Sequence, residues 1–116
     1  MPETFDITSV ESPGGTTVLR VSGQLDSKSA PVLLSRSGMI RNGSQSLVVN
    51  LAAVSFIASS GVGALLALVE QFRESGGKVR FVALSSAVDS VIRLLNLDQF
   101  LTIDQTESDA VTALEG

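Results

Sequence analysis

The segment from Leu47 to Phe72 constrains the fold most, because its hydrophobic period changes once, at Ala58-Ser59-Ser60-Gly61. Leu47 to Leu51 is a short apolar run, which is typical of a buried strand. Beyond the serines, apolar residues recur at the spacing of an amphipathic helix, with Leu68 at the border of the stripe and half buried. The residues expected to face the core are Val62, Leu65, Leu66, Val69 and Phe72. The segment therefore predicts a strand, a turn and a helix that starts at two serines.

Two adjacent hydroxyls at a helix start have two interpretations. In one, Ser59 or Ser60 is an N-cap and nothing more, because a serine hydroxyl accepts from an unpaired N–H of the first turn. However, one hydroxyl suffices for a cap, and neither serine is followed by the Glu or Gln of a capping box. In the other, the serines belong to a flat surface on which a partner docks closely. The small residues that form this surface are Gly61, Gly63, Ala64 and Ala67.

The rest of the chain alternates strand and helix patterns. Residues 5–10 and 17–22 flank a turn-forming Pro-Gly-Gly and predict an antiparallel hairpin. The other expected strands cover 78–84 and 100–103, and the expected helices cover 30–41, 60–74, 86–95 and 104–114. We expect Ser29 to cap the first of these helices, and residues 52–57 to form a connection between the central strand and the helix after it. The order β-β-α-β-α-β-α-β-α predicts an α/β fold with a single mixed β-sheet of about five strands and about four helices. We expect one domain over residues 1–116.

Two turns of the chain are expected on the same rim of this sheet. Ligands and partners gather at the carboxyl ends of parallel strands, where the strand-to-helix loops emerge. Gly23 to Asp26 and Ala58 to Gly61 both follow predicted strands. One role open to Asp26, in the first of these turns, is to cap the helix that follows it.

The composition excludes several kinds of chemistry. The 116-residue chain has no histidine and no cysteine, which removes a Ser-His-Asp triad, thiolate metal sites and disulfides. We therefore expect no enzyme, catalytic residue, metal or cofactor. The net charge of −4 and the lack of a Lys/Arg cluster argue against direct nucleic-acid binding. No secretory signal begins the sequence and no apolar run is long enough to insert in a membrane, so a cytoplasmic protein is expected.

Several of these motifs occur together in one known family. Val48-Val49-Asn50-Leu51, Phe56-Ile57, Ser59-Ser60-Gly61-Val62-Gly63 and Gly23-Gln24-Leu25-Asp26 stand in the order found there. In this pattern the chain resembles the STAS domain of bacterial anti-sigma factor antagonists, from about Phe5 to Leu114. The resemblance implies a STAS fold.

The resemblance also implies a binding switch. The unphosphorylated antagonist binds an anti-sigma factor that is itself a serine kinase, and thereby frees the sigma factor. The kinase then phosphorylates the serine at the helix start, and a metal-dependent serine phosphatase restores the free form. By position, the phosphate acceptor is Ser59, and Ser60 is its capping neighbour. The protein is expected to be a monomer or a weak dimer. The expected partner-binding residues are Asp26, Ala58, Ser60, Gly61, Gly63, Ala64 and Ala67.

One position departs from the family pattern. The family usually has Asp immediately before the phosphorylated serine, and this chain has Ala58. Alanine has no side-chain oxygen with which to cap the helix, orient the hydroxyl or meet a kinase. The alternative is a non-phosphorylated STAS interaction subunit of a lipid-transport or stress-signalling complex.

Overall fold

The computed structural model of the chain describes residues 5–43 and 46–115, and one mixed sheet runs through them. The strands follow the order β1-β2-β3-β4-β5, with β1 antiparallel to β2 and every other neighbouring pair parallel. The strands are β1 (Asp6–Glu11), β2 (Thr17–Leu25), β3 (Ser46–Ile57), β4 (Lys78–Val82) and β5 (Ile103–Asp104). The helices are α1 (Ala30–Gly43), α2 (Ser59–Glu74), α3 (Ser86–Leu94) and α4 (Glu107–Glu115), with a short 3-10 helix η1 (Leu97–Gln99). The predicted α/β class and the predicted order of elements are confirmed.

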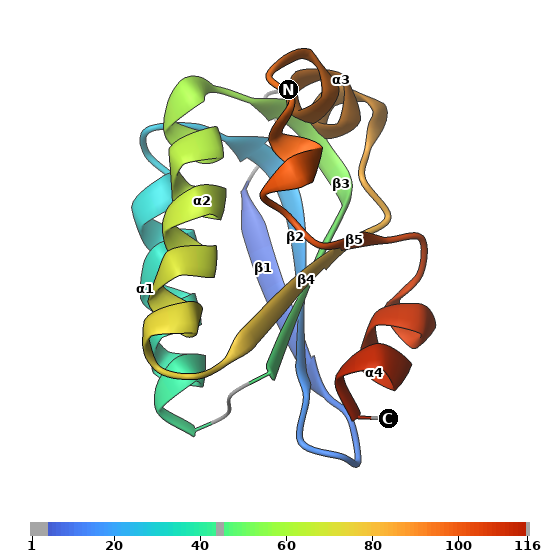
Figure 1. Ribbon diagram of the computed structural model, residues 1–116. Helices are drawn as coiled ribbons and strands as arrows, with labels where there is room; N and C mark the ends of the chain where they lie inside the picture. Colours follow the sequence, from blue (N-terminus) through green and yellow to red (C-terminus); the bar gives the residue numbers. More distant parts are fainter. Residues whose placement is uncertain (1–4, 44–45, 116) are drawn as a thin grey trace.

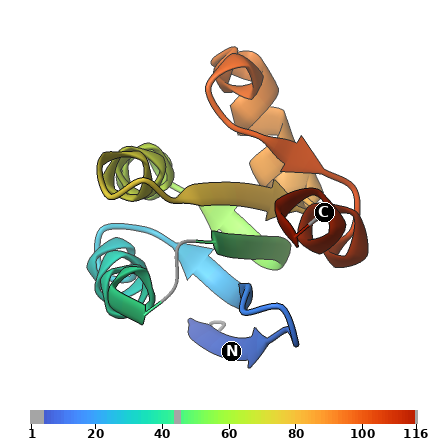
Figure 2. The same cartoon turned by 60° about the horizontal axis from the view of Figure 1, so that its bottom comes forward.

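Helices cover both faces of the sheet. Figures 1 and 2 show α1 and α2 side by side on one face and α4 on the other. α1 and α2 are in contact, and Leu68 of α2, expected to be half buried, is fully buried. Leu66 and Val69, expected in the core, are only partly buried. Among the described residues, each helix is too short or too polar to span a lipid bilayer.

β3 is longer than the sequence predicts. The expected connection over residues 52–57 is wrong, because these residues continue the strand to Ile57 and pair with the end of β2. Two register shifts, between Arg20 and Ser22 and between Gly23 and Gln24, interrupt the alternation of side chains there. The result is that β2 and β3 end next to each other.

The strand expected over 100–103 is mostly absent. Asn96 adopts the left-handed conformation (φ 55°) and ends α3, as its position predicts. The chain then turns through η1, where the N–H of Phe100 donates to the carbonyl of Leu97 at 2.9 Å. Only Ile103–Asp104 joins the sheet. This route leaves the Phe100 side chain 67% exposed.

Polar contacts hold α4 on the sheet around a small apolar cluster, in which Ala110 packs on three strand valines. Glu107 accepts from Arg20 Nε at 2.9 Å and Nη2 at 2.8 Å, and from Asn50 Nδ2 at 2.7 Å. At the other end of the helix, the Glu115 carboxylate accepts from the Ser12 hydroxyl. The hydrogen bond from Arg20 holds the pKa of Glu107 below its ordinary value, with Asn50 adding to the effect and partial burial opposing it.

The α4 contacts predict a pH dependence. A glutamate whose pKa is lowered in the folded state stabilises the fold above its unfolded pKa of about 4.3, and this stabilisation disappears as the pH falls through the lowered value. We expect Glu107→Gln to lower the free energy of unfolding by about 1 kcal/mol at pH 7 and by much less near pH 3. Urea titrations at a series of pH values measure this difference. Glu11→Gln, at an exposed position, is the control; a loss from Glu107→Gln that is independent of pH would contradict the assignment.

Candidate functional site

The two predicted loops lie on the same rim, at the carboxyl ends of β2 and β3. The N–H of Ala58 donates to the carbonyl of Leu25 at 2.9 Å, so the start of α2 is tied to the residue before Asp26. The expectation that the two loops share a rim is confirmed.

Gly61 makes this close approach possible. It is buried, and a Cβ atom added to it would lie 2.5 Å from the Leu25 carbonyl oxygen and 2.9 Å from Ile57 Cγ1. Ala64, one turn further along α2, is also buried, with 3% of its surface exposed. Gly61 and Ala64 were expected to contact a docked partner. Because both pack inside the protein, this expectation is wrong for these two residues. Gly63 is exposed and Ala67 is half buried.

The two glycines of this turn form a matched pair. We expect Gly61→Ala to lower the free energy of unfolding by about 1–3 kcal/mol, because its methyl group meets a backbone oxygen that has no room to move. Gly63→Ala should instead raise it by about 1 kcal/mol, because its added Cβ has no heavy atom within 4 Å and alanine favours the helix. Thermal and urea unfolding measure both. Equal effects of the two substitutions would contradict the packing at Gly61.

The start of α2 has no side-chain cap. Ala58 is the N-cap residue (φ −95°, ψ 172°), and no side chain caps the first turn. Ser59 and Ser60 lie inside that turn. The expectation that one of them is the N-cap is therefore wrong, and so is the expectation that Ser60 caps the helix beside a phosphorylated Ser59. Among the described residues, no hydrogen bond involves either hydroxyl; Ser59 is exposed and Ser60 is half buried. The Ser59 hydroxyl is therefore accessible from solvent, next to unpaired helix amides.

The missing cap predicts a stabilising substitution. Ala58 already has the extended backbone of an N-cap, so the carboxylate of Ala58→Asp should accept from the first-turn N–H groups. We expect the free energy of unfolding to rise by about 1 kcal/mol, measured by urea and thermal unfolding. Ala58→Asn, which supplies the oxygen without the charge, separates the hydrogen bond from the interaction with the helix dipole. No gain from either variant would contradict this geometry.

Asp26 organises the loop between β2 and α1. Its carboxylate accepts from the backbone N–H of Lys28 at 3.0 Å and of Ser29 at 3.2 Å, in the turn that leads into α1. These hydrogen bonds hold the pKa of Asp26 below its ordinary value, and the bond from the Ser29 N–H has the largest effect. Asp26 therefore keeps a negative charge on the rim. Ser29 precedes α1 as expected, and its carbonyl accepts from the Leu33 N–H at 3.0 Å. Its hydroxyl does not cap the helix, because it donates to the Gln24 carbonyl at 2.7 Å and accepts from the Asp26 N–H at 2.8 Å.

Exposed apolar side chains on α1 and β3 were not among the expected site residues. Val32 of α1 is 46% exposed and Phe56 of β3 is 49% exposed. A hollow of about 270 Å³ opens beside Asp26, lined by Phe5, Gln24, Asp26, Lys28, Ser29 and Val32. Phe56 is the register partner of Gln24, one of the residues that line the hollow. Phe56 was expected in a connection over residues 52–57, and the structure places it in β3 instead.

The comparison with known families fits this geometry. The family model described as STAS domain matches residues 8–110. The chain belongs to the STAS domain family. The resemblance found in the sequence is thus confirmed, and it covers both the β2–α1 loop and the start of α2.

Relatives of this STAS protein include regulators of sigma factors. The anti-sigma-F factor antagonist RsfB of Mycobacterium tuberculosis is 31% identical over 116 residues, which cover 99% of this chain and 93% of the relative. A solved anti-sigma factor antagonist from Mycobacterium paratuberculosis superposes with a TM-score of 0.87 at 29% identity, covering 100% of this chain and 98% of that one. These names describe regulatory proteins and not enzymes, in agreement with the expectation that the serines are not catalytic.

The fold is shared more widely. SpoIIAA, an anti-sigma factor antagonist, has been solved in its unphosphorylated form, which matches this STAS protein with a TM-score of 0.76 at 21% identity over 91% of this chain and 93% of that one. SpoIIAA has also been solved in a phosphorylated form.

Proposed function

We propose that this STAS protein is a phospho-regulated anti-sigma factor antagonist that acts in the cytoplasm. In this proposal the unphosphorylated form binds an anti-sigma factor serine kinase and frees the sigma factor. Phosphorylation of Ser59 then separates the complex, and a metal-dependent serine phosphatase restores the binding form. The observation that carries the proposal is the exposed Ser59 hydroxyl in the first turn of α2, on the same rim as Asp26.

The fold should tolerate a phosphoryl group at this place. Phosphorylation adds about −1.5 to −2 charges at neutral pH. A helix start favours an anion by about 0.3–1 kcal/mol, and the first turn of α2 contains no acidic residue and no side-chain cap that would compete. The charge on Ser59 is therefore expected to leave the stability of the protein almost unchanged.

The same charge should oppose docking. In a closed interface the phosphoryl group loses its water, and it shares the rim with the Asp26 carboxylate. Each 1.4 kcal/mol of such a cost lowers the affinity about tenfold. Binding is thus lost while the fold persists, which is what a reversible switch requires.

The proposed partner surface follows from what is accessible on the rim. Of the expected residues, Asp26, Ala58, Ser60, Gly63 and Ala67 are at least partly exposed. Val32, which lines the hollow beside Asp26, and Phe56 are exposed apolar side chains that would add contact area. The binding energy of an interface is concentrated in such aromatic and apolar anchors once they are buried.

Charge substitution at Ser59 tests the proposal. We expect Ser59→Asp to bind the partner kinase at least about tenfold more weakly than wild type, with a melting temperature nearly unchanged. Ser59→Ala should retain binding. The measurements are affinity purification from the native organism with these variants as baits, then titration calorimetry with the kinase so identified. Thr112→Asp, which places the same charge on α4 across the sheet, is the matched control; equal affinity of Ser59→Asp and wild type would contradict the switch.

The second candidate is a STAS interaction subunit that is never phosphorylated, in a lipid-transport or stress-signalling complex. The observation that favours it is Ala58, which leaves the helix start without a side-chain cap and the serine without an acidic neighbour. Intact-protein mass spectra from native cells distinguish the two: a fraction of chains with one phosphate on Ser59 supports the switch. Its absence, together with co-purified transporter ATPase subunits, supports the second candidate.

A further inference from the structure

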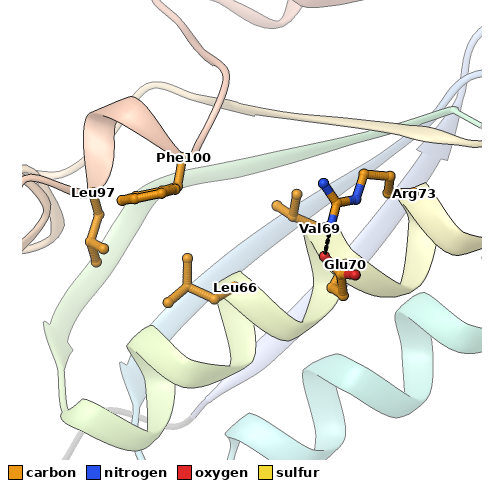
Figure 3. Close-up of a pocket in the computed structure, with 6 residues that line it drawn as sticks. All are labelled: Leu66, Val69, Glu70, Arg73, Leu97 and Phe100. Atoms are coloured by element: carbon orange, nitrogen blue, oxygen red, sulfur yellow. Dashed lines mark hydrogen bonds and ion pairs between the residues drawn. The ribbon is translucent and has the colours of Figure 1, made fainter.

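A groove away from the rim opens between α2 and η1. Figure 3 shows Leu66 and Val69 of α2 on one side and Leu97 and Phe100 on the other. The groove has a volume of about 360 Å³ and is lined mainly by apolar atoms, with Glu70 and Arg73 also in its lining. Unlike Leu65 and Leu68, the side chains of Leu66 and Val69 are only partly covered by the protein itself.

The far side of the groove forms an exposed apolar lip. Phe100, which lines this side of the groove, is 67% exposed. An exposed aromatic side chain that lines an apolar groove offers contact area to a partner. Since η1 turns Phe100 away from the core, the lip follows from the backbone path and not from loose packing.

The groove continues into a basic hollow. This second hollow, of about 280 Å³, shares Val69 and Arg73 with the first and adds Lys78 and Arg80. Arg73 is paired with Glu70, and Arg80 is paired with Asp104 at 2.9 Å. In the part of the chain that the structure describes, no ion pair involves Lys78.

The side chains that line this hollow are basic and not acidic. Its lining includes Arg73, Lys78 and Arg80, whereas the acidic neighbours Glu70, Glu74 and Asp104 lie beside the two arginines and outside the lining. Arg73 retains further N–H groups after its single contact with Glu70, because a guanidinium carries five donors. An anionic group placed at the end of the apolar groove would therefore meet two sets of available donors.

We propose that this groove binds an amphipathic helix of a partner protein, with an apolar stripe that ends in acidic residues. The stripe would pack between Leu66, Val69 and Phe100, in the manner of a helix in a groove, and the acidic turn would lie at Lys78 and Arg73. A second copy of this chain suits the surface less well, because two chains of charge −4 repel each other and the basic hollow calls for an acidic partner.

This surface is independent of the proposed switch. Val69 lies ten residues after Ser59 in α2, which at a rise of 1.5 Å per residue is a separation of about 15 Å. That exceeds the screening length of about 10 Å at 0.1 M salt. A partner that engages both surfaces would thus keep one contact when Ser59 is modified, and the inference stands whether or not Ser59 is phosphorylated.

The test uses synthetic helical peptides and the full chain labelled with ¹⁵N. Two peptides of about 15 residues carry a leucine stripe and one turn of glutamates, placed at either end. In matched controls, lysines replace the glutamates. We expect at least one glutamate peptide to shift the amide signals of Leu66, Val69, Lys78 and Phe100, and the lysine version to bind about tenfold more weakly.

Variants of the protein locate the contact. Phe100→Ala and Lys78→Glu should each weaken binding of the glutamate peptide about tenfold, and Lys78→Glu should improve binding of the lysine peptide. Both positions are exposed, so the fold should persist, as the amide spectrum verifies. Ser59→Asp should change the affinity less than about twofold.

Three results would overturn the inference. The first is the absence of shifts in the groove with either glutamate peptide, and the second is equal binding of glutamate and lysine peptides. The third is concentration-dependent self-association that Phe100→Ala abolishes, measured by sedimentation, which would assign the groove to a second copy of the chain. None of these results bears on the affinity change expected for Ser59→Asp at the rim.

Discussion

The arrangement of the rim depends on one close contact between backbones. The carbonyl of Leu25 accepts from the N–H of Ala58, and Gly61 packs against the same carbonyl oxygen with no room for a side chain. This contact fixes the start of α2 beside the β2–α1 loop, so that the charge of Asp26 and the hydroxyl of Ser59 lie on the same rim. A larger residue at Gly61 would push α2 away from the strand and separate the two parts of the site.

The two ends of α2 present different chemistry to solvent. At its start, Ser59 and Gly63 expose small residues, and the first turn contains no acidic residue. From Leu66 onward, the partly covered apolar side chains and the basic hollow give a surface suited to a different contact. One helix therefore contributes to the core, to the rim and to the groove.

Most of the fold follows from the sequence, because periodicity and turn residues specify it locally. The helix after Ser59, the hairpin and the left-handed Asn96 are of this kind. The errors arise where long-range pairing decides. The strand over 52–57 exists because it pairs with a bulged β2, and Leu68 is fully buried although the helical stripe alone predicts that it is half buried. In the site, the shared rim was predictable from strand ends, whereas the packing of Gly61 and the exposure of Phe56 depend on neighbours distant in sequence.

The alanine that departs from the family pattern is compatible with a phosphate switch. A capping side chain at position 58 and a phosphoryl group on Ser59 would compete for the same few N–H groups of the first turn, because a helix start offers only four. With Ala58 these groups have no side-chain partner in the unmodified protein. The uncapped state forgoes about 1 kcal/mol of stability and leaves the amides available to an anion. In the proposed switch, the phosphorylated form would thus gain hydrogen bonds that a capped helix would already have used.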